Sequence, residues 1–192
     1  MKTSLTQEQA FLGEIGRQIR FAMQAVEQMN TALRDENARP VNHGMYWPAL
    51  QDFVLAAAQI SKMLWPNVSS GSAIERTDRA NRGIRLRELL DVADDSALLS
   101  RKCRNHLEHF DERIDVWLGP STPGHWADFN VFSGIGDDSP ALKGQIRALN
   151  LSMGSPVVFG EAFQLQPIIN ELGEVWQRLP AALKKSREDH KA

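Results

Sequence analysis

The strongest constraint on the fold is a long apolar seam near the N-terminus. Its residues recur at intervals of three and four, the spacing that places side chains on one face of an α-helix. The seam consists of Leu12, Ile15, Ile19, Ala22, Val26, Met29 and Leu33. It predicts a helix over about residues 6–34 that buries this face in a helical bundle or against a partner chain.

Three more helices are expected before residue 118. Residues 48–65 are apolar nearly all round, which is typical of a helix in the middle of a bundle, and Pro48 suits the first helical position. Residues 78–92 and 96–118 each carry an apolar stripe with helical spacing. We therefore expect a mainly α (α+β) fold, whose first domain, residues 1–118, is an antiparallel four-helix bundle.

The helical period disappears after residue 118, where Gly, Pro, Ser and aromatic residues become frequent. The pattern predicts short strands over residues 126–132, 145–152 and 157–164, with a turn over 153–156. Together they would form a small antiparallel β-meander. Pro167 opens a final helix, and the charged residues 184–192 are expected to fray. This second part, 119–192, is expected to pack on the bundle so that the chain forms one compact unit.

The composition is that of a soluble globular protein, with 42% hydrophobic and 24% charged residues among 192. No apolar run approaches the ~20 residues that span a bilayer, and the N-terminus has no signal-peptide pattern. A cytoplasmic protein with no membrane association is expected. With Cys103 as the single cysteine, no internal disulfide can form. A net charge of −2 means that any binding to nucleic acid must use a local basic patch.

One such patch lies between residues 76 and 87, a segment that contains five arginines and one acidic residue, Asp78. In one interpretation it is a solvated helix face whose charges pair with Glu88 and Asp91. In the other it is a strip that binds phosphates through arginines spaced by three. The candidate nucleic-acid-binding residues are Arg76, Arg79, Arg82 and Arg85, together with Arg101.

The predicted helix over residues 96–118 carries the candidate catalytic chemistry. At about 100° per residue, its polar face gathers Arg104, Asn105, Glu108 and His109. Histidine can act as a general base near neutral pH, and a carboxylate from Glu108 or Glu112 would orient its ring. An arginine can hold a phosphate and stabilise its transition-state charge. These groups suffice for RNA cleavage without a metal or cofactor, although ion pairs on an ordinary bundle surface look similar.

The segment Arg104-Asn105-x-x-x-His109 resembles the Arg-polar-x-x-x-His signature of the HEPN superfamily. Members are all-α bundles, often metal-independent endoribonucleases of toxin–antitoxin or anti-phage systems. The resemblance implies a homodimer in which two motifs face one cleft, with RNA as substrate and an antitoxin protein as a partner. It makes His109 the base, Arg104 the phosphate holder and Asn105 a positioning residue, and Glu108 is expected to tune His109.

This chain departs from the family pattern in two ways. The position two residues after the histidine, which is Tyr in members silenced by nucleotidylation, is Asp111 here. The strands expected after Gly119 have no place in the minimal HEPN bundle. The alternative function is a non-catalytic HEPN-like protein that binds a protein or nucleotide through the same polar cleft.

Overall fold

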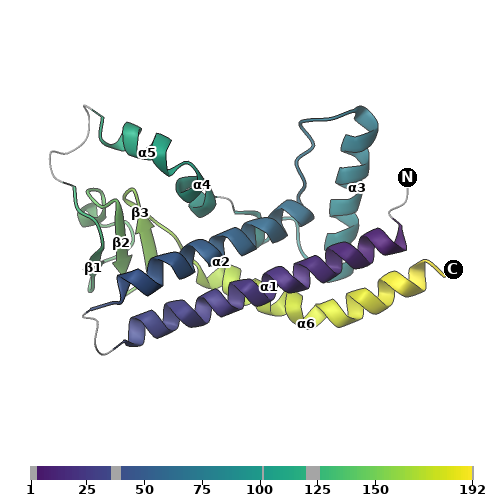
Figure 1. Cartoon of the computed structure of the whole chain (residues 1–192), viewed down its shortest axis with the longest axis horizontal. Helices are drawn as coiled ribbons and strands as arrows, with labels where there is room; N and C mark the ends of the chain where they lie inside the picture. Colours follow the sequence, from purple (N-terminus) through teal and green to yellow (C-terminus); the bar gives the residue numbers. More distant parts are fainter. Residues whose placement is uncertain (1–3, 36–39, 101, 120–125, 192) are drawn as a thin grey trace. The chain divides into compact units, whose positions relative to one another are not determined.

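The structure is a computed structural model that describes residues 4–35, 40–100, 102–119 and 126–191, and only the backbone of 102–104. It is mainly helical with one small sheet, as the sequence predicts (Figure 1). The α-helices are α1 (Leu5–Arg34), α2 (His43–Leu64), α3 (Ala73–Leu90), α4 (Lys102–Glu108), α5 (Phe110–Trp117) and α6 (Gln166–Asp189). The strands are β1 (Asn130–Phe132), β2 (Arg147–Asn150), β3 (Ser155–Val158) and β4 (Glu161–Ala162). Two short 3₁₀ turns are η1 (Ala97–Leu99) and η2 (Pro140–Leu142).

The chain divides into two compact units that interleave along the sequence. The first, here called the helical unit, comprises Met1–Ala25, Asp52–Ser100 and Ile168–Ala192. The second, the sheet unit, comprises Val26–Gln51 and Arg101–Pro167. Both α1 and α2 therefore contribute to both units, and this partition differs from the division at residue 118 that the sequence suggests.

The helical unit is built from the first part of α1, the second part of α2, α3 and most of α6. The seam residues Leu12, Ile15 and Ile19 are buried in its core, as predicted. A Cβ atom on Gly16 would lie 2.7 Å from the Leu179 side chain, so glycine permits the close approach of α1 and α6. The antiparallel arrangement of four helices over residues 1–118 stays a prediction.

Two helix starts differ from the sequence prediction. The α2 helix begins at His43 rather than at Pro48, and Pro48 lies inside it. The α3 helix begins at Ala73 rather than at residue 78, because Ser72 and Glu75 form a capping box that satisfies the first backbone N–H groups. The Ser-x-x-Glu pattern that marks this start is present in the sequence.

The predicted continuous helix over residues 96–118 is wrong. Residues 97–99 form the 3₁₀ turn η1, and α4 and α5 are separated at His109, whose ψ of 38° is not helical. Periodicity identifies the residues that share a face, and it is insensitive to a single residue with a non-helical ψ. The break was therefore not predictable from spacing.

The sheet unit contains a four-stranded sheet in the order β1-β2-β3-β4. β1 is parallel to β2, with Val131 opposite Leu149, whereas β2, β3 and β4 are antiparallel neighbours. The expected antiparallel meander is therefore wrong for β1: residues 133–146, which include η2, carry the chain back so that β2 runs in the same direction. Ser155 and Pro156, expected in a turn, pair with β2. Among the described residues, strands occur only after Trp126, as predicted.

A hydrophobic core of the sheet unit is formed by Leu142, Ala148 and Val157, which are buried together. Helix α4 is held to the end of the sheet by His106, whose Nε2 lies 2.9 Å from the Glu161 carboxylate. The ring of Phe159 lies 4.9 Å from that of Phe110, which joins α5 to the same end of the sheet. These contacts fix the helices that carry the Arg104–His109 motif.

Helix α6 begins at Gln166, close to the predicted start at Pro167, and continues through Pro180 to Asp189. The expected fraying over residues 184–192 is therefore wrong for most of this segment. Ser186 is fully buried within it and contacts α1. No helix in the described part of the chain is long and apolar enough to cross a membrane.

Candidate functional site

The motif residues Asn105 and His109 lie together in the structure. The backbone N–H of His109 donates to the Asn105 carbonyl at 3.2 Å, so helical hydrogen bonding continues up to the break. Both residues line a pocket of about 480 Å³ with Glu112, Arg113 and Val116, here called the motif pocket. Asn105 and His109 therefore line one pocket despite the interrupted helix, whereas the wider face predicted with Arg104 and Glu108 stays a prediction.

The carboxylate that the structure places beside His109 is that of Glu112. The Nδ1 atom of His109 lies 3.5 Å from Oε2 of Glu112, and both side chains are more than half exposed. Glu108 is not among the residues that line the motif pocket. Arg113 lines it, and sequence reasoning assigned that arginine no role. The side chain of Arg104 and the whole of Arg101 lie outside the described residues.

The arginines of the predicted phosphate strip belong to the helical unit, whereas the motif pocket belongs to the sheet unit. Arg76 and Arg79 donate to the carbonyls of Gly71 and Ser70, in the loop before α3. The guanidinium of Arg82 lies 4.3 Å from the centre of the Phe11 ring. Burial and the neighbouring charge of Arg79 lower the pKa of Arg82. These arginines are thus held by local contacts.

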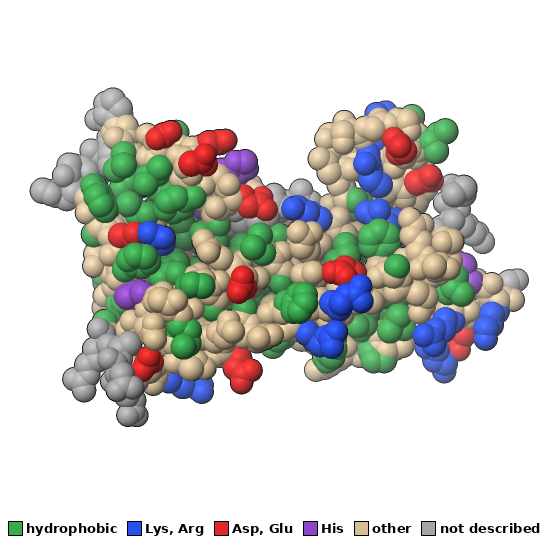
Figure 2. Space-filling view, in the orientation of Figure 1, with side chains coloured by type: hydrophobic (Ala, Val, Ile, Leu, Met, Phe, Trp, Pro, Cys, Tyr) green, Lys and Arg blue, Asp and Glu red, His purple; other side chains and the backbone are tan. Residues whose placement is uncertain are grey.

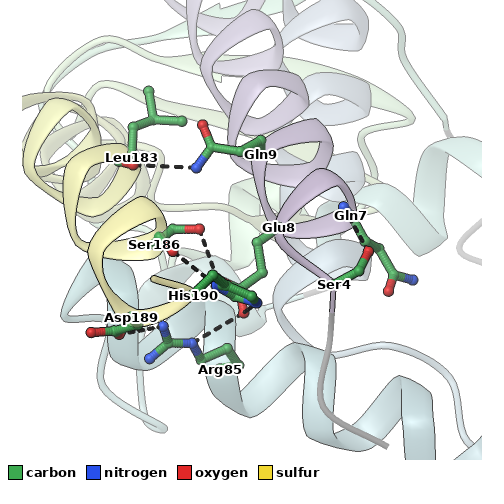
Figure 3. A network of polar contacts seen from close by, with 9 residues as sticks. All are labelled: Ser4, Gln7, Glu8, Gln9, Arg85, Leu183, Ser186, Asp189 and His190. Atoms are coloured by element: carbon green, nitrogen blue, oxygen red, sulfur yellow. Dashed lines mark hydrogen bonds and ion pairs between the residues drawn. The ribbon is translucent and has the colours of Figure 1, made fainter. Parts of the chain in front are cut away.

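Arg85 belongs to a polar network that joins three helices of the helical unit (Figure 3). Its guanidinium pairs with Glu8 of α1 at 3.2 Å and with Asp189 of α6 at 2.5 Å. Ser186 donates a hydrogen bond to Glu8 at 2.8 Å, and His190 lies 4.0 Å from the same carboxylate. Because Glu8 is only 2% exposed, Arg85 neutralises a buried charge.

A second pocket, of about 610 Å³, lies within the sheet unit and was missed by sequence reasoning. Four of its nine lining residues have aromatic rings, so we call it the aromatic pocket. It is lined by His43, Gly44, Trp47, Pro48, Gln51, Leu107, Phe110, Phe129 and Arg147. Figure 2 shows hydrophobic side chains gathered over the sheet and α5, with acidic, basic and histidine side chains among them.

Two residues of α2 form one side of the aromatic pocket. The indole Nε1 of Trp47 donates to Nδ1 of His43 at 3.2 Å, so a neutral His43 carries its proton on Nε2. Burial lowers the pKa of His43, and the charge of Asp128 opposes this shift without reversing it. The ring of Phe129 lies 5.4 Å from that of His43 and 6.1 Å from that of Trp47.

An ion pair fixes the opposite side of the aromatic pocket. Nε of Arg147 donates to Oδ1 of Asp128 at 2.9 Å, and Nη2 pairs with Oδ2 of the same carboxylate. The guanidinium lies 4.3 Å from the centre of the Phe129 ring and 5.4 Å from that of Phe110. The backbone N–H of Phe129 donates to the Arg147 carbonyl at 2.8 Å. Four side chains thus hold one another in place.

The available sequence signal for this pocket was weak. His43 and Trp47 are four residues apart, which places them on one helix face only if the helix starts before Pro48. Arg147 and Phe129 come from separate segments, and spacing within one segment cannot pair them. Among the described residues, no three His, Cys, Asp or Glu side chains gather in a group that could hold a metal ion.

Comparison with known proteins gives no relative for this chain: no family model, curated protein or solved structure matches it.

Proposed function

We propose that this protein is a HEPN-like, metal-independent endoribonuclease whose general base is His109. The observation that carries the proposal is that His109, Asn105 and Arg113 line one open pocket. An imidazole, an amide and a guanidinium are the groups that metal-free RNA cleavage uses: a base, a positioning group and a cation for the phosphate.

The proposed reaction is a transesterification within the RNA chain, in which the phosphate is transferred from the 5′-oxygen of the next nucleotide to the ribose 2′-oxygen. Neutral His109 accepts the proton of a ribose 2′-OH, and the 2′-oxygen attacks the adjacent phosphorus. The bond from phosphorus to the 5′-oxygen breaks, and that oxygen takes up a proton. The products are a 2′,3′-cyclic phosphate and a 5′-hydroxyl. Arg104, by the family resemblance, and Arg113, by its place in the pocket, would stabilise the negative charge on the phosphate oxygens.

Glu112 takes the role that the sequence suggested for Glu108. Its carboxylate is 3.5 Å from Nδ1 of His109, which leaves Nε2 of the ring to face a substrate. Both side chains are exposed, so the pair contributes at most about 1 kcal/mol to folding stability. The role of Glu112 is therefore to orient the ring and fix its tautomer.

The exposure of His109 makes a homodimer part of the proposal. Its side chain is 54% exposed, whereas proton transfer and charge stabilisation work best where water is excluded. A second copy facing the motif pocket across a two-fold axis would cover it and bring a second imidazole to protonate the leaving 5′-oxygen. The proposal also includes a HEPN-like four-helix arrangement, a toxin–antitoxin or anti-phage role, and an antitoxin protein as a partner. These parts rest on the resemblance to the HEPN superfamily.

The same exposure favours the alternative, a non-catalytic HEPN-like protein that binds a protein or nucleotide through the motif pocket. One experiment separates the two functions. The purified chain is incubated with single-stranded RNA in EDTA, and the product ends are identified by mass spectrometry. Cleavage with 2′,3′-cyclic phosphate ends, lost in His109→Ala, supports the ribonuclease. RNA that is bound but intact supports the alternative.

A further inference from the structure

We infer that the aromatic pocket binds a neutral, planar heteroaromatic small molecule. At about 610 Å³ its volume is within the range of small-molecule sites, and its lining shares no residue with that of the motif pocket. The inference is independent of ribonuclease activity, because it rests only on the side chains of the aromatic pocket.

Two unfavourable local conformations border this pocket. Pro48 lies inside α2, where proline removes a backbone hydrogen bond and its ring crowds the preceding turn. Phe129 has φ of +62°, a left-handed conformation that bulky residues rarely adopt. Residues that depart from the usual backbone and helix preferences are found more often at functional sites than elsewhere. Both irregular residues line the same pocket, which marks it as more than a packing defect.

The ring geometry favours a planar ligand. The rings of His43 and Phe129 are inclined by 48°, and those of Trp47 and Phe129 by 61°. Phe110 from α5 adds a further ring to the lining. Rings at these angles offer both faces and edges, which is how aromatic groups contact another aromatic ring most favourably.

The charges at the pocket favour a neutral ligand. A cationic ligand is disfavoured because the Arg147 guanidinium already lies over Phe129 and near Phe110, so a second cation would meet a like charge. An anionic ligand is disfavoured because Asp128 already holds Arg147 through two oxygens. Burial also lowers the pKa of His43, which keeps its ring neutral at physiological pH.

The polar groups at the pocket favour a ring that contains heteroatoms. Neutral His43 presents an Nε2–H donor, because Nδ1 accepts from Trp47. Pro48 has no N–H, so the carbonyl of Gly44, a residue of the pocket lining, lacks the hydrogen bond from position i+4 that a regular α-helix supplies. A flat ring with one N–H and one bare nitrogen would match this donor and this acceptor.

The test uses indazole, a neutral bicyclic ring with one N–H and one bare nitrogen, as the probe for the full chain. Two comparison probes are 1,3-dimethylbenzimidazolium, a cation of similar shape, and cyclohexanol, which is not planar. Calorimetry and proton NMR should show saturable indazole binding with a dissociation constant of about 1 mM or below, as expected for a fragment of this size. Both comparison probes should bind at least about tenfold more weakly.

The location is tested by Phe129→Gly, which removes the ring and keeps a residue that accepts positive φ. This variant should weaken indazole binding about threefold to tenfold. The control Phe21→Ala removes an exposed ring outside the pocket and should change nothing. Should Phe129→Gly melt below the assay temperature, Gln51→Trp, which fills the pocket from its exposed rim, takes its place, with Gln59→Trp as its control.

Four results would overturn the inference. These are the absence of saturable indazole binding, equal affinity for the cationic probe, equal affinity for cyclohexanol, and unaltered binding in the pocket variants.

Discussion

The carboxylate of Glu8 and the guanidinium of Arg85 form an ion pair, with 3.2 Å between Oε1 and Nε, that links α1 to α3. Burial alone would lower the pKa of Arg85, but hydrogen bonds to Asp189 and Glu8 outweigh it and raise the pKa. The arginines that look equivalent in the sequence are therefore not equivalent in the structure. Arg85 neutralises a buried charge, whereas Arg79 donates to an exposed loop carbonyl.

Replacing Arg85 by alanine should lower the free energy of unfolding by about 3–5 kcal/mol, because it leaves the Glu8 carboxylate buried without its cation. Arg79→Ala is the matched control from the same helix and should cost about 1 kcal/mol or less. Urea unfolding monitored by circular dichroism measures both values. Equal small losses in the two variants would show that Glu8 does not depend on Arg85.

The arginine strip also predicts how RNA binding responds to salt. If Arg76 and Arg79 contact phosphates, replacing either by glutamine should reduce the slope of log K against log salt by about 0.7 for single-stranded RNA. Arg20→Gln removes the same charge from an exposed position on α1 and is the control. Fluorescence anisotropy at several salt concentrations measures the slopes. If the three variants behave alike, the strip is a solvated face.

The sequence predicts the helices well because their cores obey one simple spacing. Leu12, Ile15 and Ile19 are buried, as the seam requires, whereas Leu33 at the end of the seam is 38% exposed. Helix ends were predicted less well, because they depend on single residues. Ser72 and Glu75 extend α3 at its start, and Pro48 does not mark the start of α2.

The sheet and the sites depend on contacts between distant segments, and local patterns do not encode these contacts. The parallel pairing of β1 with β2 is an example, because a meander was the simplest order for three consecutive strands. The motif pocket contains Asn105 and His109, which the sequence placed on one helix face. The carboxylate near His109 is that of Glu112, whereas the sequence suggested Glu108. The aromatic pocket joins Trp47 with Phe129, which are far apart in sequence.

His43 should make stability depend on pH. Burial lowers its pKa in the folded protein below the value of about 6.5 expected when unfolded. The unfolded chain therefore binds more protons between the two pKa values, and stability rises with pH across that window. The contribution is fully present above about pH 6.5 and is lost as the pH falls through the folded pKa.

His43→Asn should therefore flatten the pH dependence of unfolding free energy below about pH 6.5, measured in urea at several pH values. An NMR titration gives the pKa of the His43 ring directly. A ring pKa at or above 6.5 in the folded protein would contradict this account.

A composite site across a dimer can be tested by mixing inactive variants. If His109 of one chain works with Arg104 of the other, unfolding and refolding His109→Ala together with Arg104→Ala should restore part of the activity. One site in each mixed dimer then keeps the base and the arginine, although it lacks the second imidazole. Two copies of either variant alone should stay inactive. Light scattering that shows a monomer at tens of micromolar would exclude this arrangement.

In the proposed ribonuclease, the chemical step depends on the imidazole of His109. His109→Ala should lower the cleavage rate by about 10²–10⁴ by removing the base. It should change the unfolding free energy by no more than about 0.5 kcal/mol, because the side chain is exposed. Cleavage should persist in EDTA, and RNA with a 2′-deoxyribose at the scissile position should resist.

Substitutions of the arginines and glutamates of α4 and α5 should separate their roles in cleavage. Arg104→Ala or Arg113→Ala should slow cleavage by about 10²–10³, according to which of the two guanidinium groups stabilises the phosphate. The decrease in rate caused by that variant should not add to the decrease caused by His109→Ala. Glu112→Gln should slow cleavage more than Glu108→Gln, because the Glu112 carboxylate lies 3.5 Å from Nδ1 of His109. A larger effect of Glu108→Gln would return the orienting role to the residue that the sequence suggested.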